Sequence, residues 1–336
     1  MLDQRTVVTL LKAAAEPTRL RLLVLLRCGE LNVKDLTRIL GQSQPRISRH
    51  LKLMAEAGLI ERLADGSWAY YHLVQRGPRA ALLSGILDGL TSDDPIFERD
   101  RKRAEAVKHE REAAAQDFFR QHAAEWDRIR SMHVSEGEVE RALGEALGPG
   151  PFRLLVDLGT GTGRLLELFV DRYERGIGFD INHSMLAYAR GKLDAAGLEA
   201  KASVRHGDIY DVALADGSAD AVVMHQVLHF LAEPALAVSE AARILAPGGR
   251  LVIVDFAPHG MEFLRERFAH ERLGFAVAHV SQWMVENGLV VEPALSLLPE
   301  TAEREGKLGV TIWIARRPRE GAELSPLIDQ RDEVEA

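Results

Sequence analysis

The chain has 336 residues, of which 46% are hydrophobic and 27% charged, a composition typical of folded globular proteins rather than of disordered chains. At about 100–200 residues per domain, this length predicts two domains. No apolar run approaches the ~18–20 residues that span a bilayer, and the first thirty residues lack the basic start and apolar core of a signal peptide. The one cysteine, Cys28, cannot form an intramolecular disulfide. We therefore expect a cytoplasmic protein.

The net charge of −8 is unevenly distributed along the chain. Residues 1–95 hold 13 Lys and Arg against 10 Asp and Glu, a balance of +3, and the remaining 241 residues have a balance of −11. Basic surfaces attract nucleic acid, so if one of the two parts contacts DNA, the charge balance favours the N-terminal part. A balance of +3 is modest, so a prediction of DNA binding has to rest mainly on the residue pattern.

The first forty residues predict three helices. Residues 6–28 are expected to form two, separated at Glu16-Pro17-Thr18. Asn32 is a suitable N-cap for a third helix, which Gly41 would close.

The next thirty residues predict a fourth helix and a hairpin. Ser43 is expected to cap the helix, whose buried face carries Ile47, Leu51 and Met54 at i, i+4 and i+7. Two short β-runs around Asp65-Gly66 then predict a hairpin. Helix, short turn, helix and hairpin in this order predict a winged helix-turn-helix.

The rest of the chain changes character twice. Residues 95–131 predict one or two long helices, whose later part is made apolar by Phe118, Phe119 and Trp126. From 152 to 316, strand-like apolar runs alternate with helical segments, which predicts a mostly parallel sheet. The last twenty residues, 317–336, are polar and acidic and are expected to form a loose tail.

A glycine-rich loop follows the first strand of the α/β region. An apolar run containing Asp157 leads into Gly159-Thr160-Gly161-Thr162-Gly163, and a helix is expected from Arg164 to Val170. Glycines let the backbone turn sharply and approach a ligand, while the helix N-terminus offers free N–H groups. Taken alone, the loop fits a dinucleotide site, an S-adenosylmethionine (SAM) site or a simple tight turn.

Acids at the ends of the following strands narrow this choice. Asp180 ends a short strand 17 residues past Gly163, where a carboxylate can accept both hydroxyls of a ribose. A third strand at 202–206 leads to Gly207-Asp208-Ile209, and a fourth at 219–224 leads to His225-Gln226.

In these motifs, residues about 115–316 resemble class I SAM-dependent methyltransferases, nearest to the ubiquinone/menaquinone type. The resemblance rests on Val156–Gly163, Gly178–Asp180, Gly207-Asp208 and Leu245–Gly249. It implies an α/β Rossmann-like domain of seven strands, with the last antiparallel. Leu289–Leu298 and Leu308–Ala315 fit the closing pair of strands.

The same resemblance implies a set of cofactor-binding residues. These are Asp157, Gly159, Thr160, Gly161, Gly163, Asp180, Ile181, Asp208, Ile209, His225 and Gln226. The acid and glycines of the first loop would hold the methionine end of SAM or S-adenosylhomocysteine, and Asp180 would take the ribose hydroxyls. Asp208 would meet the adenine amino group, with an isoleucine packing on each face of the ring.

Catalysis by such a domain needs little chemistry from the protein. The sulfonium already activates the methyl group, so alignment matters most and a base is needed only for poorly acidic nucleophiles. His225 and His229 are the candidate catalytic residues, with His259 as a third candidate base; each also fits an ordinary polar position at a strand end or helix surface. Arsenite methyltransferases use several cysteines. This domain has none, so we do not expect it to methylate arsenite. The methyl acceptor is not encoded in any motif.

The N-terminal domain resembles the ArsR/SmtB repressors over about residues 5–90. The resemblance rests on Glu16–Leu23, Glu30–Leu36, Gln42–Lys52 and Ala57–Ile60. It implies a homodimer whose helix 43–55 reads the major groove of an operator. Gln44, Ser48 and Arg49 would then reach base edges, and Arg46, Lys52 and the wing residue Arg62 would contact phosphates.

This chain departs from the metal-sensing members of that family. Asn32-Val33-Lys34 stands where thiolate sensors carry cysteines, and His109 with Glu112 is all that represents a histidine/carboxylate site. We therefore expect no metal, and Cys28 is expected to be a small buried filler.

These observations predict four regions. They are a small α+β winged helix-turn-helix domain at 1–92, a helical linker at 93–150, a Rossmann-like methyltransferase domain at 151–316 and an acidic tail at 317–336. The first hypothesis is a dimeric transcriptional regulator that binds double-stranded DNA under the control of SAM or S-adenosylhomocysteine. The second is an active methyltransferase of a small molecule, whose winged helix serves dimerisation. Whether the domain turns over or only senses its ligand stays open.

Overall fold

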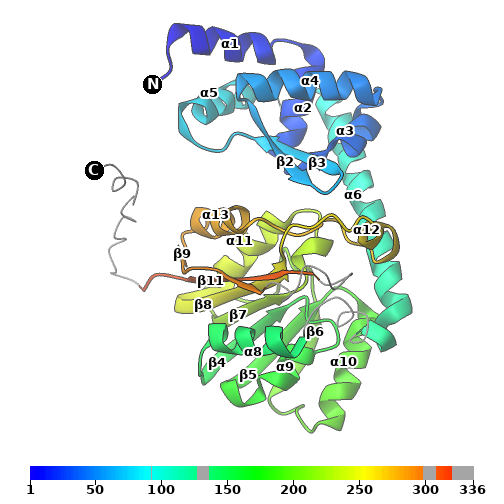
Figure 1. Ribbon diagram of the computed structural model, residues 1–336, viewed down its shortest axis with the longest axis vertical. Coiled ribbons are helices and arrows are strands. Elements are labelled where there is room, and N and C mark those ends of the chain that lie inside the picture. The colour runs from blue at the N-terminus through cyan, green and yellow to red at the C-terminus, as the bar shows by residue number, and fades with distance from the viewer. Residues whose placement is uncertain (92, 127–135, 298–307, 320–336) are drawn as a thin grey trace. The chain divides into compact units, whose positions relative to one another are not determined.

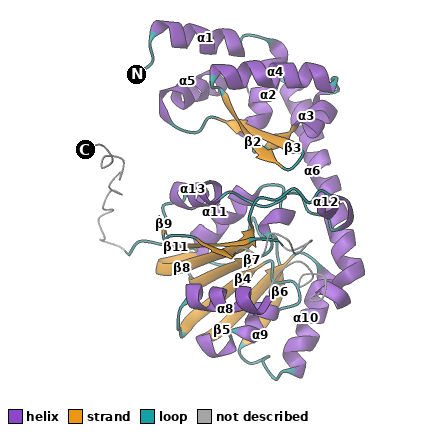
Figure 2. Ribbon diagram, in the orientation of Figure 1, coloured by secondary structure: helices purple, strands orange, loops and turns teal. Residues whose placement is uncertain are grey.

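The computed structural model describes residues 1–91, 93–126, 136–297 and 308–319, and the chain divides into two compact units (Figures 1 and 2). The first unit contains residues 1–122 together with 228–234 and 256–275, and the second contains the rest. The expected linker, 93–150, is thus shared between the units: the helix that begins at Pro95 belongs to the first. The expected tail lies outside the described residues from 320 onward.

The first unit begins as a winged helix-turn-helix, as predicted. Its helices are α1 (Gln4–Ala14), α2 (Pro17–Arg27), α3 (Val33–Leu40), α4 (Gln44–Ala57), α5 (Gly77–Asp88) and α6 (Pro95–His122). Its strands are β1 (Leu31–Asn32), β2 (Ile60–Asp65) and β3 (Trp68–Leu73), in the antiparallel order β1-β3-β2. The two-residue strand β1 was not predicted, because two residues are too few to show a period.

Local sequence explains where these helices begin and end. Asn32 accepts the N–H of Asp35 at 3.0 Å, as a helix cap does, and Gly41 ends α3 in the left-handed conformation. Ser43 occupies the cap position of α4 without a side-chain hydrogen bond to that helix. The apolar faces of α1 to α4 meet in one core that includes Leu10, Leu22, Leu23, Leu36, Ile39, Ile47, Leu51 and Met54.

The long helix α6 is joined to this core by a buried ion pair. Arg21 of α2 donates two hydrogen bonds to Asp100, at 2.6 and 2.9 Å. Val107 adds an apolar contact about two turns further along. The prediction of one or two helices over 95–131 is confirmed as far as His122, and residues 127–135 lie outside the described part. No helix among the described residues is long and apolar enough to cross a membrane.

The second unit is a layered α/β fold. Its strands are β4 (Phe152–Leu158), β5 (Tyr173–Asp180), β6 (Ala202–His206), β7 (Ala219–His225), β8 (Leu245–Phe256), β9 (Val290–Val291), β10 (Leu295–Leu297) and β11 (Val310–Arg316). They run in the order β10-β11-β8-β7-β4-β5-β6, and β9 pairs with β11. The pairs β4–β5, β4–β7, β5–β6 and β7–β8 are parallel, whereas β9 and β10 are antiparallel to β11. The mostly parallel Rossmann-like sheet is as predicted, but it has eight described strands instead of seven, because the expected strand Leu289–Leu298 is divided into β9 and β10. Leu298 itself lies outside the described residues.

Helices cover this sheet, as Figure 2 shows by colour. They are α8 (Glu136–Leu147), α9 (Arg164–Leu168), α10 (His183–Ala195), α11 (Pro234–Ile244) and α13 (Val277–Glu286). The central strands are buried on both sides; Leu155, Val156, Val222, Val223 and Val252 have no exposed surface. Strands that are apolar on both faces are what a parallel sheet between helix layers requires.

Candidate cofactor site and DNA-recognition surface

The carboxyl end of β4 is the point where the order of the strands reverses. From β4 the chain moves outward through β5 and β6, then returns to the other side of β4 as β7 and β8. In open α/β sheets, a crevice for ligands opens at this place, because the connections on the two sides diverge. The cofactor-binding residues predicted from sequence are therefore expected at the carboxyl ends of β4, β5, β6 and β7.

The glycine loop is held by backbone bonds and by lack of space. The N–H groups of Gly159 and Thr160 both donate to the carbonyl of Phe179 on β5, at 2.9 Å. Gly159 has φ +76°, and a Cβ there would overlap Val227. A Cβ on Gly178 of β5 would likewise overlap the side chain of Thr160. Glycine is therefore required at these positions by the close approach of neighbouring atoms.

A buried acid, Asp157, and a half-buried one, Asp180, support the same loop. Asp157 accepts the hydroxyl of Thr160 at 2.7 Å, and Asp180 accepts the N–H groups of Gly161 at 2.9 Å and Asn182 at 2.8 Å. Burial raises the pKa of the Asp180 carboxyl, although these backbone N–H groups oppose the rise. The carboxylate of Asp180 thus stands at the loop with both oxygens oriented by backbone.

Aromatic and apolar groups surround this cradle within the second unit. The indole nitrogen of Trp126 lies 3.7 Å from the position that a Cβ of Gly161 would take, so this aromatic residue packs beside the loop. Ile181, directly after Asp180, is 46% exposed. Asp208 is exposed and accepts the N–H of Tyr210 at 3.0 Å, and Ile209 is half-buried.

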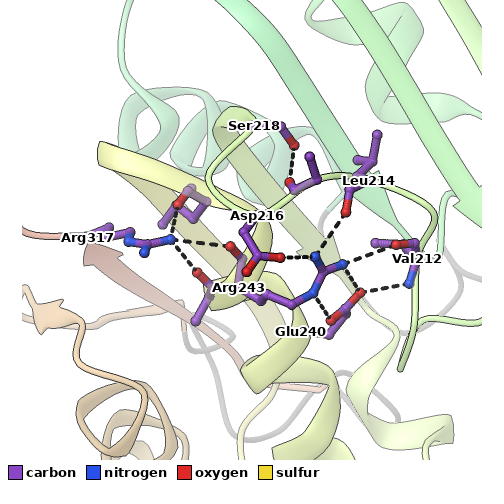
Figure 3. Close-up of polar contacts among 10 residues, drawn as sticks. Val212, Leu214, Asp216, Ser218, Glu240, Arg243 and Arg317 are labelled. Atoms are coloured by element: carbon purple, nitrogen blue, oxygen red, sulfur yellow. Dashed lines mark hydrogen bonds and ion pairs between the residues drawn. The ribbon is translucent and has the colours of Figure 1, made fainter.

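An arginine–glutamate network fixes the chain between β6 and β7 (Figure 3). Glu240 of α11 accepts the N–H of Val212 at 2.7 Å and two bonds from Arg243, each at 2.7 Å. Arg243 also donates to the carbonyls of Val212 and Leu214, at 3.1 and 2.9 Å. The carboxylates of Glu240 and Asp216, to both of which Arg243 donates, hold the pKa of its guanidinium above its usual value. The network anchors the segment that begins at Asp208, and nothing in the local sequence had predicted it.

The end of β7 is strained. Gln226 has φ +52° although it is not glycine, is 6% exposed, and donates its N–H to the carbonyl of Val254 at 2.7 Å. Non-glycine residues in this conformation cost free energy and gather at ligand sites. His225, directly before it, is half-buried.

The three histidines named as candidate bases are divided between the units. His225 belongs to the second unit, while His229 and His259 belong to the first. His229 is 2% exposed, and its ring lies 4.3 Å from that of His270 and 4.7 Å from that of Phe256, centroid to centroid. His259 accepts the N–H of Met261 at 3.2 Å.

In the first unit, α4 turns its polar residues to solvent. Its buried residues are Ile47, Leu51 and Met54, as predicted. The exposed residues are Gln44, Arg46, Arg49 and Lys52, with Ser48 half-buried, and Arg62 is exposed on β2. Lys52 lies 3.8 Å from Glu56 one turn further along, so one of the three cations on this surface is partly neutralised by its own helix.

The metal and thiol features can be placed as well. Among the described residues, no group of three or more His, Cys, Asp or Glu side chains could hold a metal ion. His109 and Glu112 form an exposed pair on α6, 3.6 Å apart. The expectation that Cys28 is buried is wrong: it is exposed at the C-terminal cap of α2, beyond the apolar stripe of that helix.

Together these features define two classes of protein in one chain, a winged helix-turn-helix and a Rossmann-like methyltransferase fold. Residues 16–62 match the model of the bacterial regulatory protein arsR family, and residues 156–253 match that of the methyltransferase domain. The chain is a fusion of an ArsR-family winged helix-turn-helix with a domain of the SAM-dependent methyltransferase fold.

Relatives of known name match one half each. Demethylmenaquinone methyltransferase of Thermus thermophilus is 39% identical over 120 residues, which are 35% of this chain and 53% of that enzyme. The arsenic resistance regulator ArsR1 of Pseudomonas putida is 44% identical over 80 residues, which are 23% of this chain and 62% of the regulator. The chain thus spans only about half to three fifths of these relatives.

A solved structure supports the fold. The complex of the Haloferax volcanii Trm112 methyltransferase activator with a putative methyltransferase contains a chain that matches 60% of this chain and 98% of its own length. The TM-score is 0.50 at 23% sequence identity, which speaks for shared architecture and for nothing finer.

Proposed function

We propose that this protein is a dimeric transcriptional regulator whose binding to operator DNA responds to SAM or S-adenosylhomocysteine. The observation that carries the proposal is the pairing, in one chain, of a solvent-facing basic recognition helix with a preformed glycine cradle for an adenosyl ligand. A regulator needs a surface for DNA and a site for a signal, and each unit offers one of these.

The DNA arm of the proposal uses the exposed side chains of α4. Arg49, Gln44 and Ser48 would read base edges, and Arg46, Lys52 and Arg62 would contact phosphates. The similarity to ArsR1, by name a transcriptional regulator, supports this assignment. A homodimer would present two copies of α4 to two half-sites.

The ligand arm uses the cradle of the second unit. Asp180 would exchange loop N–H groups for ribose hydroxyls or share its oxygens between them, and Asp157 with the glycine loop would hold the methionine end. Ile181 and Ile209 would pack on the two faces of the adenine ring, and the 46% exposure of Ile181 leaves its side chain accessible to a ligand. Asp208 would accept the adenine amino group.

The second candidate function is methyl transfer to a small molecule. The strained backbone at Gln226, beside His225, favours it, because strain of this kind is common where a substrate is positioned. In this function the winged helix would serve dimerisation, and His225 and His229 would be the catalytic residues. The two functions are compatible in one chain.

Selection of genomic DNA fragments by the purified protein tests the first function. The selection is run without ligand, with SAM and with S-adenosylhomocysteine. We expect one enriched palindromic sequence whose affinity changes about 5–150-fold with ligand, the usual range for coupled sites. By linkage, that operator must change ligand affinity by the same factor. If no sequence is enriched in any condition, the first function is refuted and methyl transfer with a dimerising winged helix is favoured.

A further inference from the structure

The wing of the first unit is in contact with a segment from much later in the chain. This segment, residues 256–275, is here called the strap. It leaves β8 at Phe256, forms the short helix α12 (Phe263–Arg267) and rejoins the second unit before α13. Its contacts with the wing, β2–turn–β3, are contacts within one unit and involve buried charge.

The C-terminal half of the strap is the anchor. Arg272 is 3% exposed, pairs with Glu30 at 2.8 Å and lies with its guanidinium 3.5 Å from the centre of the Tyr70 ring. The hydroxyl of Tyr70 donates to the Glu271 carboxylate at 2.9 Å. The N–H of Leu273 donates to Asp65 at 2.8 Å. The anchor thus joins the strap to the wing through a buried ion pair, a cation–π contact and two hydrogen bonds.

The N-terminal half of the strap contacts the tip of the wing. Glu262 accepts the N–H of Ser67 in the wing turn at 2.5 Å. Arg265 pairs with Asp65 at 3.0 Å and lies over the ring of Trp68 at 4.4 Å. A Cβ at Gly66 would overlap Glu262 and Leu273, so the wing turn and the strap touch without a gap.

The Ser67 N–H that donates to Glu262 is also a donor that a DNA phosphate could accept. Backbone N–H groups are among the common donors to DNA phosphates, and a carboxylate oxygen resembles a phosphate oxygen in charge and acceptor geometry. Glu262 therefore occupies this donor at the wing tip, and its carboxylate also pairs with Arg265 of the strap at 3.3 Å. The side chain of Glu262 is 35% exposed, unlike the anchor, so the tip contact can open while the anchor stays formed.

We propose that the strap autoinhibits DNA binding: Glu262 holds the wing-turn donor, and release of this contact frees the wing for a phosphate. The inference rests on the proposed DNA binding of the winged helix and adds its regulation. Since the strap continues directly from β8, whose Val254 accepts the N–H of Gln226, it also provides a covalent route from the ligand site to the wing.

The test compares two single-charge variants of the full-length protein. Glu262→Ala removes the contact, and Glu266→Ala removes an exposed acid of the same short helix, so both lose one negative charge. Binding to a mixed-sequence 30-base-pair duplex is measured by fluorescence anisotropy at several salt concentrations. We expect Glu262→Ala to bind roughly tenfold more tightly than Glu266→Ala. Its plot of log K against log salt should be steeper by about 0.9, the value for one added phosphate contact.

A second variant and a second readout separate the possible failures. Glu262→Gln keeps an oxygen for Ser67 and should fall between the two. Hydrogen exchange of the wing peptide should be faster in Glu262→Ala than in Glu266→Ala. If the protein binds DNA but the two alanine variants agree in affinity and slope, or if exchange at the wing is equal, autoinhibition is refuted and the proposed function stands. If no variant binds DNA even at low salt, the proposed function fails, and the inference with it.

Discussion

The wing turn and the glycine loop are both tight turns at which a side chain on glycine would overlap a neighbour, yet they are held in opposite ways. The loop bonds to Phe179 and Asp180, about twenty residues away, and mainly through backbone groups. The wing turn is held by side chains of the strap, with Glu262 lying 195 residues beyond Ser67. A turn supported by its own neighbourhood is a fixed part of a binding site, whereas a turn supported by a distant segment can be released by whatever moves that segment.

The largest effect is expected when the cation of the anchor, Arg272, is removed. Arg272→Ala removes a buried cation that pairs with Glu30 and lies over the Tyr70 ring, and we expect a loss of about 3–5 kcal/mol in the stability of the first unit. Arg27→Ala is the matched control, because the Arg27–Asp88 pair has a similar length, 2.6 Å, but is half exposed, and such pairs contribute about 0–1 kcal/mol. Hydrogen exchange in the peptides of residues 1–122 reports the change. Equal losses in the two variants would mean that the anchor does not hold the wing.

The corresponding test of the loop concerns one acid. Asp180→Ala should weaken SAM binding by roughly tenfold or more, because bonds to a charged group contribute about 1.5–3 kcal/mol. Calorimetry of the variant beside Asp194→Asn, an exposed acid on α10, measures this. Unchanged affinity in Asp180→Ala would remove the end of β5 from the ligand site.

Sequence alone could predict the loop but not the strap, and the reason is physical. Val156–Gly163 and Gly178–Asp180 encode a strand, a turn and an acid whose partners are local, so their pattern in the chain is nearly their pattern in space. The network of Glu240 and Arg243 and the strap contacts join residues whose local sequence shows only ordinary charged helix and loop. Cys28 was expected to be a small buried filler because no thiolate metal site was predicted, but it lies exposed at the C-terminal cap of α2, two residues after the last buried leucine of that helix.

The exposed helix α4 should respond differently from either turn, because its polar face is free to contact DNA rather than the protein. Arg49→Ala is expected to cost about 1–3 kcal/mol on a selected operator and to relax discrimination at one base pair. Lys52→Ala should weaken binding to all sequences alike and lower the salt slope by about one. Binding titrations of each variant on operator duplexes and on mixed-sequence duplexes test both expectations. If both variants match wild type, α4 is only a structural element.

The smallest expected effect belongs to a contact that is entirely local. Glu16 caps α2 by accepting the N–H of Arg19 at 2.8 Å. Burial opposes ionisation of this carboxyl, but the hydrogen bonds from Arg19 and Thr18 together with the nearby His50 outweigh it, and the pKa of Glu16 is lowered from 4.5. A carboxyl with a lowered pKa in the folded state stabilises the fold above its unfolded pKa and loses this contribution as the pH falls through the folded value. Glu16→Ala should therefore cost about 1 kcal/mol at pH 7 and progressively less below about pH 4.5. Urea unfolding of the variant and wild type at pH 7 and pH 4 measures the difference. A cost independent of pH would show that the cap acts through packing rather than charge, and that even the most local support in the first unit is not electrostatic.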